Sequence, residues 1–199
     1  MDTLVEKQLS VYSFGNKKAD GGRDMKNLLG GKGANLAEMS RIGIPVPPGF
    51  TITTEVCTQY NEEGRESVIN RIEPEVRAAI TQIEETMGAI FGDDENPLLI
   101  SVRSGARVSM PGMMDTVLNL GLNDVTVEGL AKRSGNVRFA WDSYRRFVTM
   151  FGDVVLGIHY TRFARVVDQV RQGREESELS VDELKALVGE LKAVVEEGH

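Results

Sequence analysis

Three glycines surround a lysine at Gly30-Gly31-Lys32-Gly33, directly before residues with helical spacing. Glycine leaves the backbone amides open to close approach and tolerates positive φ. A helix that starts here offers N–H groups without intrahelical acceptors and the positive end of the helix dipole. Together with the Lys32 ammonium, these groups predict a binding site for an anion such as a phosphate. A glycine-rich turn before a packed helix, with a merely solvated lysine, is the alternative that these residues leave open.

The spacing around Lys32 differs from that of a Walker A loop. Lys26 stands where that motif has its first glycine, and Gly33 stands where it has a serine or threonine for magnesium. A P-loop NTPase is therefore disfavoured.

A second candidate site follows a predicted strand. Leu98–Arg103 is typical of a buried strand that ends in an arginine, and Thr116–Leu120 predicts a second strand that can pair with it as a long-looped hairpin. The arginine guanidinium presents a planar fork of donors suited to phosphate oxygens. Ser104 and Gly105 add a hydroxyl and amides, so the segment resembles the electrostatic clamps of phosphoryl transfer. An ion pair between Arg103 and a carboxylate is the alternative.

The rest of the chain predicts mixed strands and helices up to residue 123 and helices alone beyond it. We therefore expect an α+β fold, with a mixed subdomain over residues 1–123 and a helical subdomain over 124–199. Pro74 interrupts an apolar stripe, so the pattern predicts a helix break or a helix start there. The local signals at helix ends are Gly43 as a C-cap, Asn136 as an N-cap and a capping box from Ser180 to Glu183.

Composition limits the classes of partner. The net charge of the 199 residues is −7, which argues against a broad nucleic-acid-binding surface. Cys57 is the single cysteine, so a disulfide framework is excluded, and we expect it to pack as a small apolar side chain. The sequence has no apolar run of membrane-spanning length and no signal-peptide pattern, so a cytoplasmic protein is expected.

Two long stretches carry a specific family resemblance. The segment Leu28–Met39, with the following Gly43–Phe50, resembles the nucleotide-binding signature of the pyruvate, phosphate dikinase family. The resemblance is strongest over residues 97–123, which contain a methionine-rich loop, and it continues through Phe139–Phe147. Phosphoenolpyruvate synthases share the glycine and proline features but lack this form of the loop, which favours the dikinases.

The resemblance implies part of an ATP-grasp nucleotide-binding domain. The family converts ATP, phosphate and pyruvate into AMP, pyrophosphate and phosphoenolpyruvate through a phosphohistidine on a separate swivelling domain. By position, Lys32 and Arg103 match the family's phosphate-binding lysine and arginine, which makes them the predicted catalytic and nucleotide-binding cations. Gly112 matches a glycine of the active-site loop, and Gly31, Gly33, Ser104 and Gly105 are the neighbouring residues expected to bind phosphate.

The family's proteins are several times longer than 199 residues. The resemblance implies that the Mg²⁺ ligands, the phosphohistidine and the pyruvate site lie outside this chain, so no metal ligand is predicted within it. We therefore expect weak ATP or AMP binding and no turnover by the isolated chain. The implied partners are the nucleotide and the swivelling domain, within a parent enzyme that is homo-oligomeric. A stand-alone, non-catalytic module that binds a nucleotide or a partner protein is the alternative.

Overall fold

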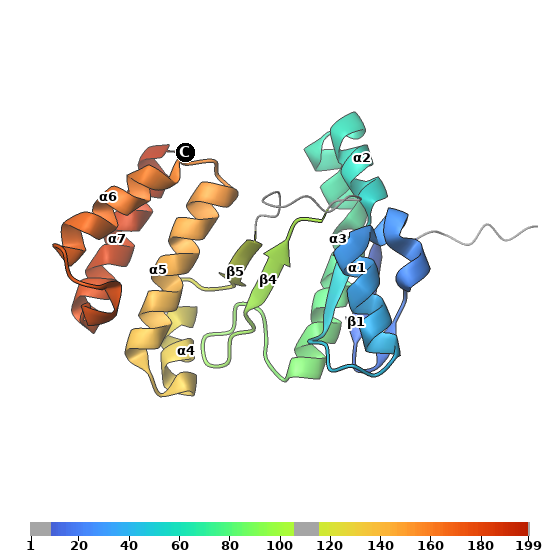
Figure 1. Ribbon diagram of the computed structural model, residues 1–199, viewed down its shortest axis with the longest axis horizontal. Helices are drawn as coiled ribbons and strands as arrows, with labels where there is room; N and C mark the ends of the chain where they lie inside the picture. Colours follow the sequence, from blue (N-terminus) through green and yellow to red (C-terminus); the bar gives the residue numbers. More distant parts are fainter. Residues whose placement is uncertain (1–8, 106–115, 199) are drawn as a thin grey trace, which may run out of the picture. The chain divides into compact units, whose positions relative to one another are not determined.

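The computed structural model of the protein describes residues 9–105 and 116–198. These residues form two compact units, one of residues 9–88 and 105 and the other of residues 89–104 and 116–198. Each unit combines helices with a small antiparallel sheet (Figure 1), so the predicted α+β class is confirmed.

The first unit contains, in chain order, β1 (Val11–Gly15), β2 (Lys18–Ala19), the 3₁₀ helix η1 (Arg23–Met25), α1 (Lys26–Arg41), β3 (Gly49–Ile52), α2 (Thr54–Glu63) and α3 (Arg65–Met87). The second contains β4 (Ile100–Arg103), β5 (Thr116–Leu120), α4 (Thr126–Ser134), α5 (Val137–Val154), α6 (Tyr160–Arg171), the 3₁₀ helix η2 (Glu176–Glu178) and α7 (Val181–Gly198). None of the helices in the described residues combines the length and the apolar character needed to span a membrane.

The sheet of the first unit has the order β2-β1-β3. The carboxylate of Glu75, on α3, accepts hydrogen bonds from the backbone N–H groups of Ser10 and Val11 at 2.8 and 3.1 Å. On α1, the buried Ser40 hydroxyl accepts a bond from the Gly15 amide and donates one to the Lys18 carbonyl, both at 2.9 Å. These side-chain bonds attach α1 and α3 to the central strand.

Two predictions for the first unit fail and one is confirmed. α3 continues through Pro74 without interruption. The buried side chains Val68, Ile72, Ala79 and Ile83 lie on both sides of the proline, so packing of the whole apolar stripe outweighs the lost hydrogen bond. Cys57 is exposed rather than packed. Gly43, with φ of 87°, follows the end of α1 as the predicted C-cap glycine.

β4 and β5 pair in antiparallel register, as predicted from the sequence, with Arg103 opposite Thr116. The predicted strand from Leu98 is shorter, since β4 begins at Ile100, and it is exposed rather than buried. In the described residues β4 has only β5 as a neighbour in its sheet, which leaves the side chains from residue 101 to 103 accessible.

The core of the second unit lies among α4, α5, α6 and α7, which Figure 1 shows side by side. Its fully buried centre consists of Val127, Ala140, Phe163, Leu184, Leu187 and Leu191. β5 packs against α5, so the sheet belongs to the same unit as the helices. The division predicted after residue 123 follows secondary-structure type, whereas these units follow packing, and that division stays a prediction.

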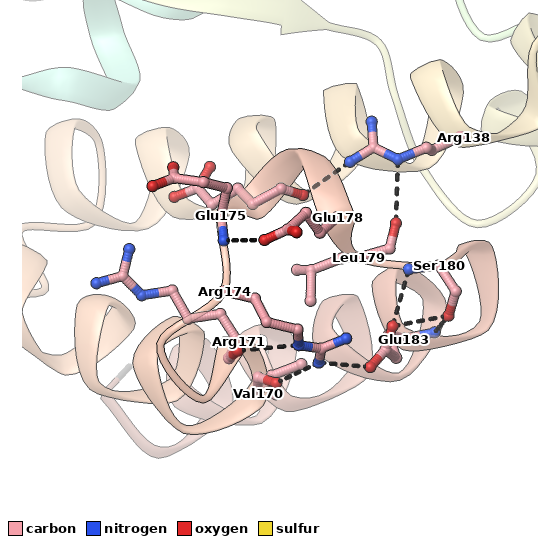
Figure 2. A network of polar contacts seen from close by, with 10 residues as sticks. Arg138, Val170, Arg171, Arg174, Glu175, Glu178, Leu179, Ser180 and Glu183 are labelled. Atoms are coloured by element: carbon pink, nitrogen blue, oxygen red, sulfur yellow. Dashed lines mark hydrogen bonds and ion pairs between the residues drawn. The ribbon is translucent and has the colours of Figure 1, made fainter.

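Arginines hold the segment between α6 and α7 (Figure 2). Arg174 donates to the Val170 and Arg171 carbonyls at the end of α6 and to the Glu183 carboxylate of α7 at 2.7 Å. Glu183 also accepts bonds from the Ser180 amide and hydroxyl, which confirms the predicted capping box. Arg138, on α5, donates to the Glu176 and Leu179 carbonyls. The connection is therefore attached to three helices by its backbone and side chains.

We predict that Gly152→Ala lowers the free energy of unfolding by about 1–3 kcal/mol because it overpacks the contact between α5 and α6. A Cβ at Gly152 would lie 2.3 Å from Cζ of the fully buried Phe163. Gly189→Ala in α7 is the control, since a Cβ there meets nothing within 4 Å, and it should raise stability by about 1 kcal/mol through helix propensity. Urea unfolding measures both; equal effects of the two variants would contradict the packing account.

A second prediction concerns acid stability. The hydrogen bond from Arg174, followed by those from Ser180, lowers the pKa of Glu183 from 4.5 to about 2. A lowered folded-state pKa means that the ionised carboxylate stabilises the fold above its ordinary pKa, and that this contribution is lost as the pH falls from about 5 towards 2. Glu183→Gln should therefore have a lower free energy of unfolding than the wild type at neutral pH. The difference between the two proteins should narrow as the pH falls over this range.

Glu190→Gln, on an exposed position of the same helix, is the matched control and should show no such narrowing. Denaturant midpoints measured at several pH values give the comparison. A Glu183→Gln deficit that stays constant from neutral pH to pH about 2 would show that the carboxylate does not act through its ionisation.

Candidate functional site

The glycine–lysine segment contains a sharp break in α1. Gly30 has φ of 69° and ψ of 169°, so it separates a short helical segment over residues 26–29 from a longer one over 31–41. Residues other than glycine rarely adopt this φ. The prediction of a glycine turn before a helix is confirmed, but the turn is the single residue Gly30 and the helix starts at Gly31 rather than at Ala34. Lys32 therefore lies in the first turn of the second segment.

Lys32 and Gly33 differ in exposure. Lys32 is exposed, whereas Gly33 is buried against β3. A Cβ at Gly33 would lie 2.8 Å from both Oγ1 and Cγ2 of Thr51. The absent side chain thus lets α1 approach the strand closely, and this contact directs the Lys32 ammonium to solvent at a helix start, where an anion is stabilised.

Arg103 is the last residue of β4 and is exposed. It pairs across the sheet with Thr116, so its backbone position is set by the hairpin. Ser104 and Gly105 follow it, also exposed, and Gly105 has open space where a Cβ would be. The predicted loop residues that come next, including Gly112, lie outside the described residues.

The described candidate residues fall into two groups. Gly31, Lys32 and Gly33 lie on α1 in the first unit. Arg103 and Ser104, at the end of β4, belong to the second unit, whereas the next residue, Gly105, is grouped with the first. The convergence of Lys32 and Arg103 on one ligand stays a prediction. Within residues 9–105 and 116–198, no three His, Cys, Asp or Glu side chains are grouped so that they could hold a metal ion.

Two arginines of α5 and a histidine before α6 form contacts within the second unit. Arg145 is 5% exposed and donates to Asp142 at 2.9 Å and to Glu176 at 2.6 Å. Its neighbour Arg146 forms an ion pair with Asp142 on the same helix. His159 caps α6 by accepting a bond from the Thr161 amide. These side chains all form hydrogen bonds or ion pairs within the second unit.

One contact beside the candidate site was not predicted from the sequence. The Thr54 hydroxyl donates to the Asn27 carbonyl at 2.7 Å, which links the start of α2 to the short helical segment before Gly30. The pair Thr53-Thr54 is recognisable in the sequence only as a helix-capping signal. A bond between residues so far apart along the chain has no local sequence signature.

Comparison with known proteins identifies the family. Residues 26–75 and 66–149 match the model of the pyruvate phosphate dikinase AMP/ATP-binding domain. Together these ranges cover more than half of the chain and include both Lys32 and Arg103. The chain belongs to the pyruvate, phosphate dikinase family.

Sequence identity to individual dikinases supports this assignment. The chain is 52% identical over 190 residues to pyruvate, phosphate dikinase of Clostridium symbiosum, and 52% identical over 190 residues to that of Rhizobium meliloti. It is 54% identical over 187 residues to pyruvate, phosphate dikinase 2 of rice. These alignments cover 94%, 94% and 92% of this chain and 21% of each relative. The chain thus spans about a fifth of the length of these dikinases.

The two helical glycines beside Lys32 provide a test of the site geometry. Gly33→Ala should lower the free energy of unfolding by about 1–3 kcal/mol, because the added methyl group forces α1 away from Thr51. Gly31→Ala has no atom within 4 Å of its new Cβ and should leave stability unchanged or slightly higher. Thermal or urea unfolding of both variants measures the difference. If Gly33→Ala is as stable as Gly31→Ala, α1 is not seated on β3 as described.

Proposed function

We propose that this chain binds the polyphosphate of ATP as the nucleotide-binding part of a pyruvate, phosphate dikinase, with the ATP-grasp fold that this role implies. The observation that carries the proposal is the match of residues 26–149 to the AMP/ATP-binding domain of this family. The identity of about 52% to complete dikinases supports it, since that similarity extends over nearly all of the chain.

Lys32 is the first phosphate-binding group in this proposal. Its ammonium is exposed at the start of the helical segment that follows Gly30. A helix start attracts an anion through its free N–H groups and dipole, and the lysine adds a full positive charge at the same place. The amides of Gly31 and Gly33 are the backbone donors expected there.

Arg103 is the second phosphate-binding group in this proposal. An exposed guanidinium at the end of a paired strand can donate two parallel hydrogen bonds to phosphate oxygens. Ser104 and Gly105 follow with a hydroxyl and backbone amides. In our proposal Lys32 and Arg103 bind the same polyphosphate, so that both cations neutralise charge developing during phosphoryl transfer.

The complete reaction requires more than this chain. We propose that the longer protein interconverts ATP, phosphate and pyruvate with AMP, pyrophosphate and phosphoenolpyruvate through a phosphohistidine on another domain. Mg²⁺ would be held by residues outside this chain, and the swivelling domain would meet the bound nucleotide. The isolated chain is then a nucleotide-binding unit that has no turnover of its own.

We predict that Lys32→Ala and Arg103→Ala each weaken ATP binding about ten-fold or more, because each removes a charge-assisted hydrogen bond. Lys132→Ala and Arg165→Ala are matched controls at exposed positions of α4 and α6, and they should leave the affinity unchanged. Titration calorimetry at fixed salt, or NMR titration where binding is weak, measures the dissociation constants.

Activity of the longer protein gives a second measurement. Magnesium- and phosphate-dependent AMP formation should fall in Lys32→Ala and Arg103→Ala, and not in the controls. If both variants retain full activity in a well-folded protein, the assigned cations are wrong. Tight ATP binding by the isolated chain without any metal would instead favour the stand-alone binding module.

A further inference from the structure

A side-chain hydrogen bond from Thr54 holds the short segment that precedes Gly30. The hydroxyl of Thr54 donates to the carbonyl oxygen of Asn27 at 2.7 Å. The last four carbonyls of a helix have no intrahelical donors, and a segment of residues 26–29 is too short to satisfy its own. The Thr54 hydroxyl therefore supplies a partner that the segment cannot provide.

Thr54 is itself well fixed. It is the first residue of α2 and follows the buried Thr53, whose amide donates to the Ser10 carbonyl at 3.0 Å. Threonine is β-branched, so its χ1 angle is restricted once the backbone is set. The hydroxyl is thus held at a defined place beside the end of β3.

The same strand–helix connection also contacts the other side of the break. Thr51 of β3 packs against Gly33, where an added Cβ would come within 2.8 Å of its side chain. Thr54 holds the segment before Gly30 and Thr51 lies against the segment after it. The φ and ψ angles of Gly30 are therefore constrained by contacts on both sides of the break, and Lys32 is two residues from Gly30.

We propose that Thr54 is a positioning residue for Lys32: its hydrogen bond to Asn27 holds the Gly30 turn in the geometry that presents the Lys32 ammonium and the amides of Gly31 and Gly33 to polyphosphate. The inference rests on the proposed function, in which Lys32 binds ATP. If the turn is ordered before ATP binds, binding does not lose the conformational entropy of ordering it, and the affinity is higher.

The test compares variants of Thr54 with a matched variant of Thr58. Thr54→Val keeps the shape and removes the donor, and Thr54→Ser keeps the hydroxyl. Thr58→Val is the control, because this exposed threonine of α2 bonds only to the Thr54 carbonyl of its own helix among the contacts described. ATP affinity of the chain is measured for each variant, together with hydrogen–deuterium exchange of the amides of residues 29–34 without ligand.

We expect Thr54→Val to weaken ATP binding about three- to ten-fold and to speed exchange of these amides. Thr54→Ser should restore both values to those of the wild type, and Thr58→Val should change neither. Thr54→Ala is a second variant without the hydroxyl and should behave as Thr54→Val does, which separates the lost donor from any misfit of valine.

The outcomes distinguish this inference from the proposed function. If Lys32→Ala weakens ATP binding and Thr54→Val has no more effect than Thr58→Val, the positioning role is overturned and the proposed function stands. Faster exchange with unchanged ATP affinity overturns it equally, because the hydroxyl then serves the fold alone. If Lys32→Ala leaves ATP affinity unchanged, both the positioning role and the assigned phosphate site are wrong.

Discussion

The close contact between Gly33 and Thr51 determines how the candidate site of the first unit is built. Because no side chain separates them, α1 lies directly on β3, and Lys32 is exposed in the first helical turn after Gly30. The break at Gly30, with φ of 69°, separates this segment from the short one over residues 26–29. A lysine in a regular helix would present one charge. Here it is presented together with the amides of a helix start.

Local sequence signals predicted the ends of elements well. Asn136 accepts the Phe139 amide, Ser180 and Glu183 form their capping box, and Gly43 follows the end of α1. Each of these features depends on residues within a few positions of each other. The residue types and their spacing are therefore enough to recognise it in the sequence. The pairing of β4 with β5 was also predictable, because two short strands flank a single loop.

Features set by distant contacts were not predictable in this way. Pro74 was expected to break a helix or to start one, yet α3 continues across it, with buried side chains on both sides of the proline. Arg145 has the sequence context of an exposed helix charge but is buried between Asp142 and Glu176. For the site, the glycines and cations could be recognised, whereas Thr54 could not, since its bond to Asn27 exists only after β3 and α2 are in place. The family resemblance suggested phosphate-binding roles for Lys32 and Arg103. Local chemistry had left open a solvated side chain for Lys32 and an ion pair with a carboxylate for Arg103.

The central proposal is that Lys32 and Arg103 bind one polyphosphate. A crystal structure of the chain with a non-hydrolysable ATP analogue tests it most directly. The account predicts that phosphate oxygens of a single analogue molecule lie about 3 Å from both the Lys32 Nζ and the Arg103 guanidinium. An analogue bound to only one of these side chains, with the other directed away from it, would contradict the account.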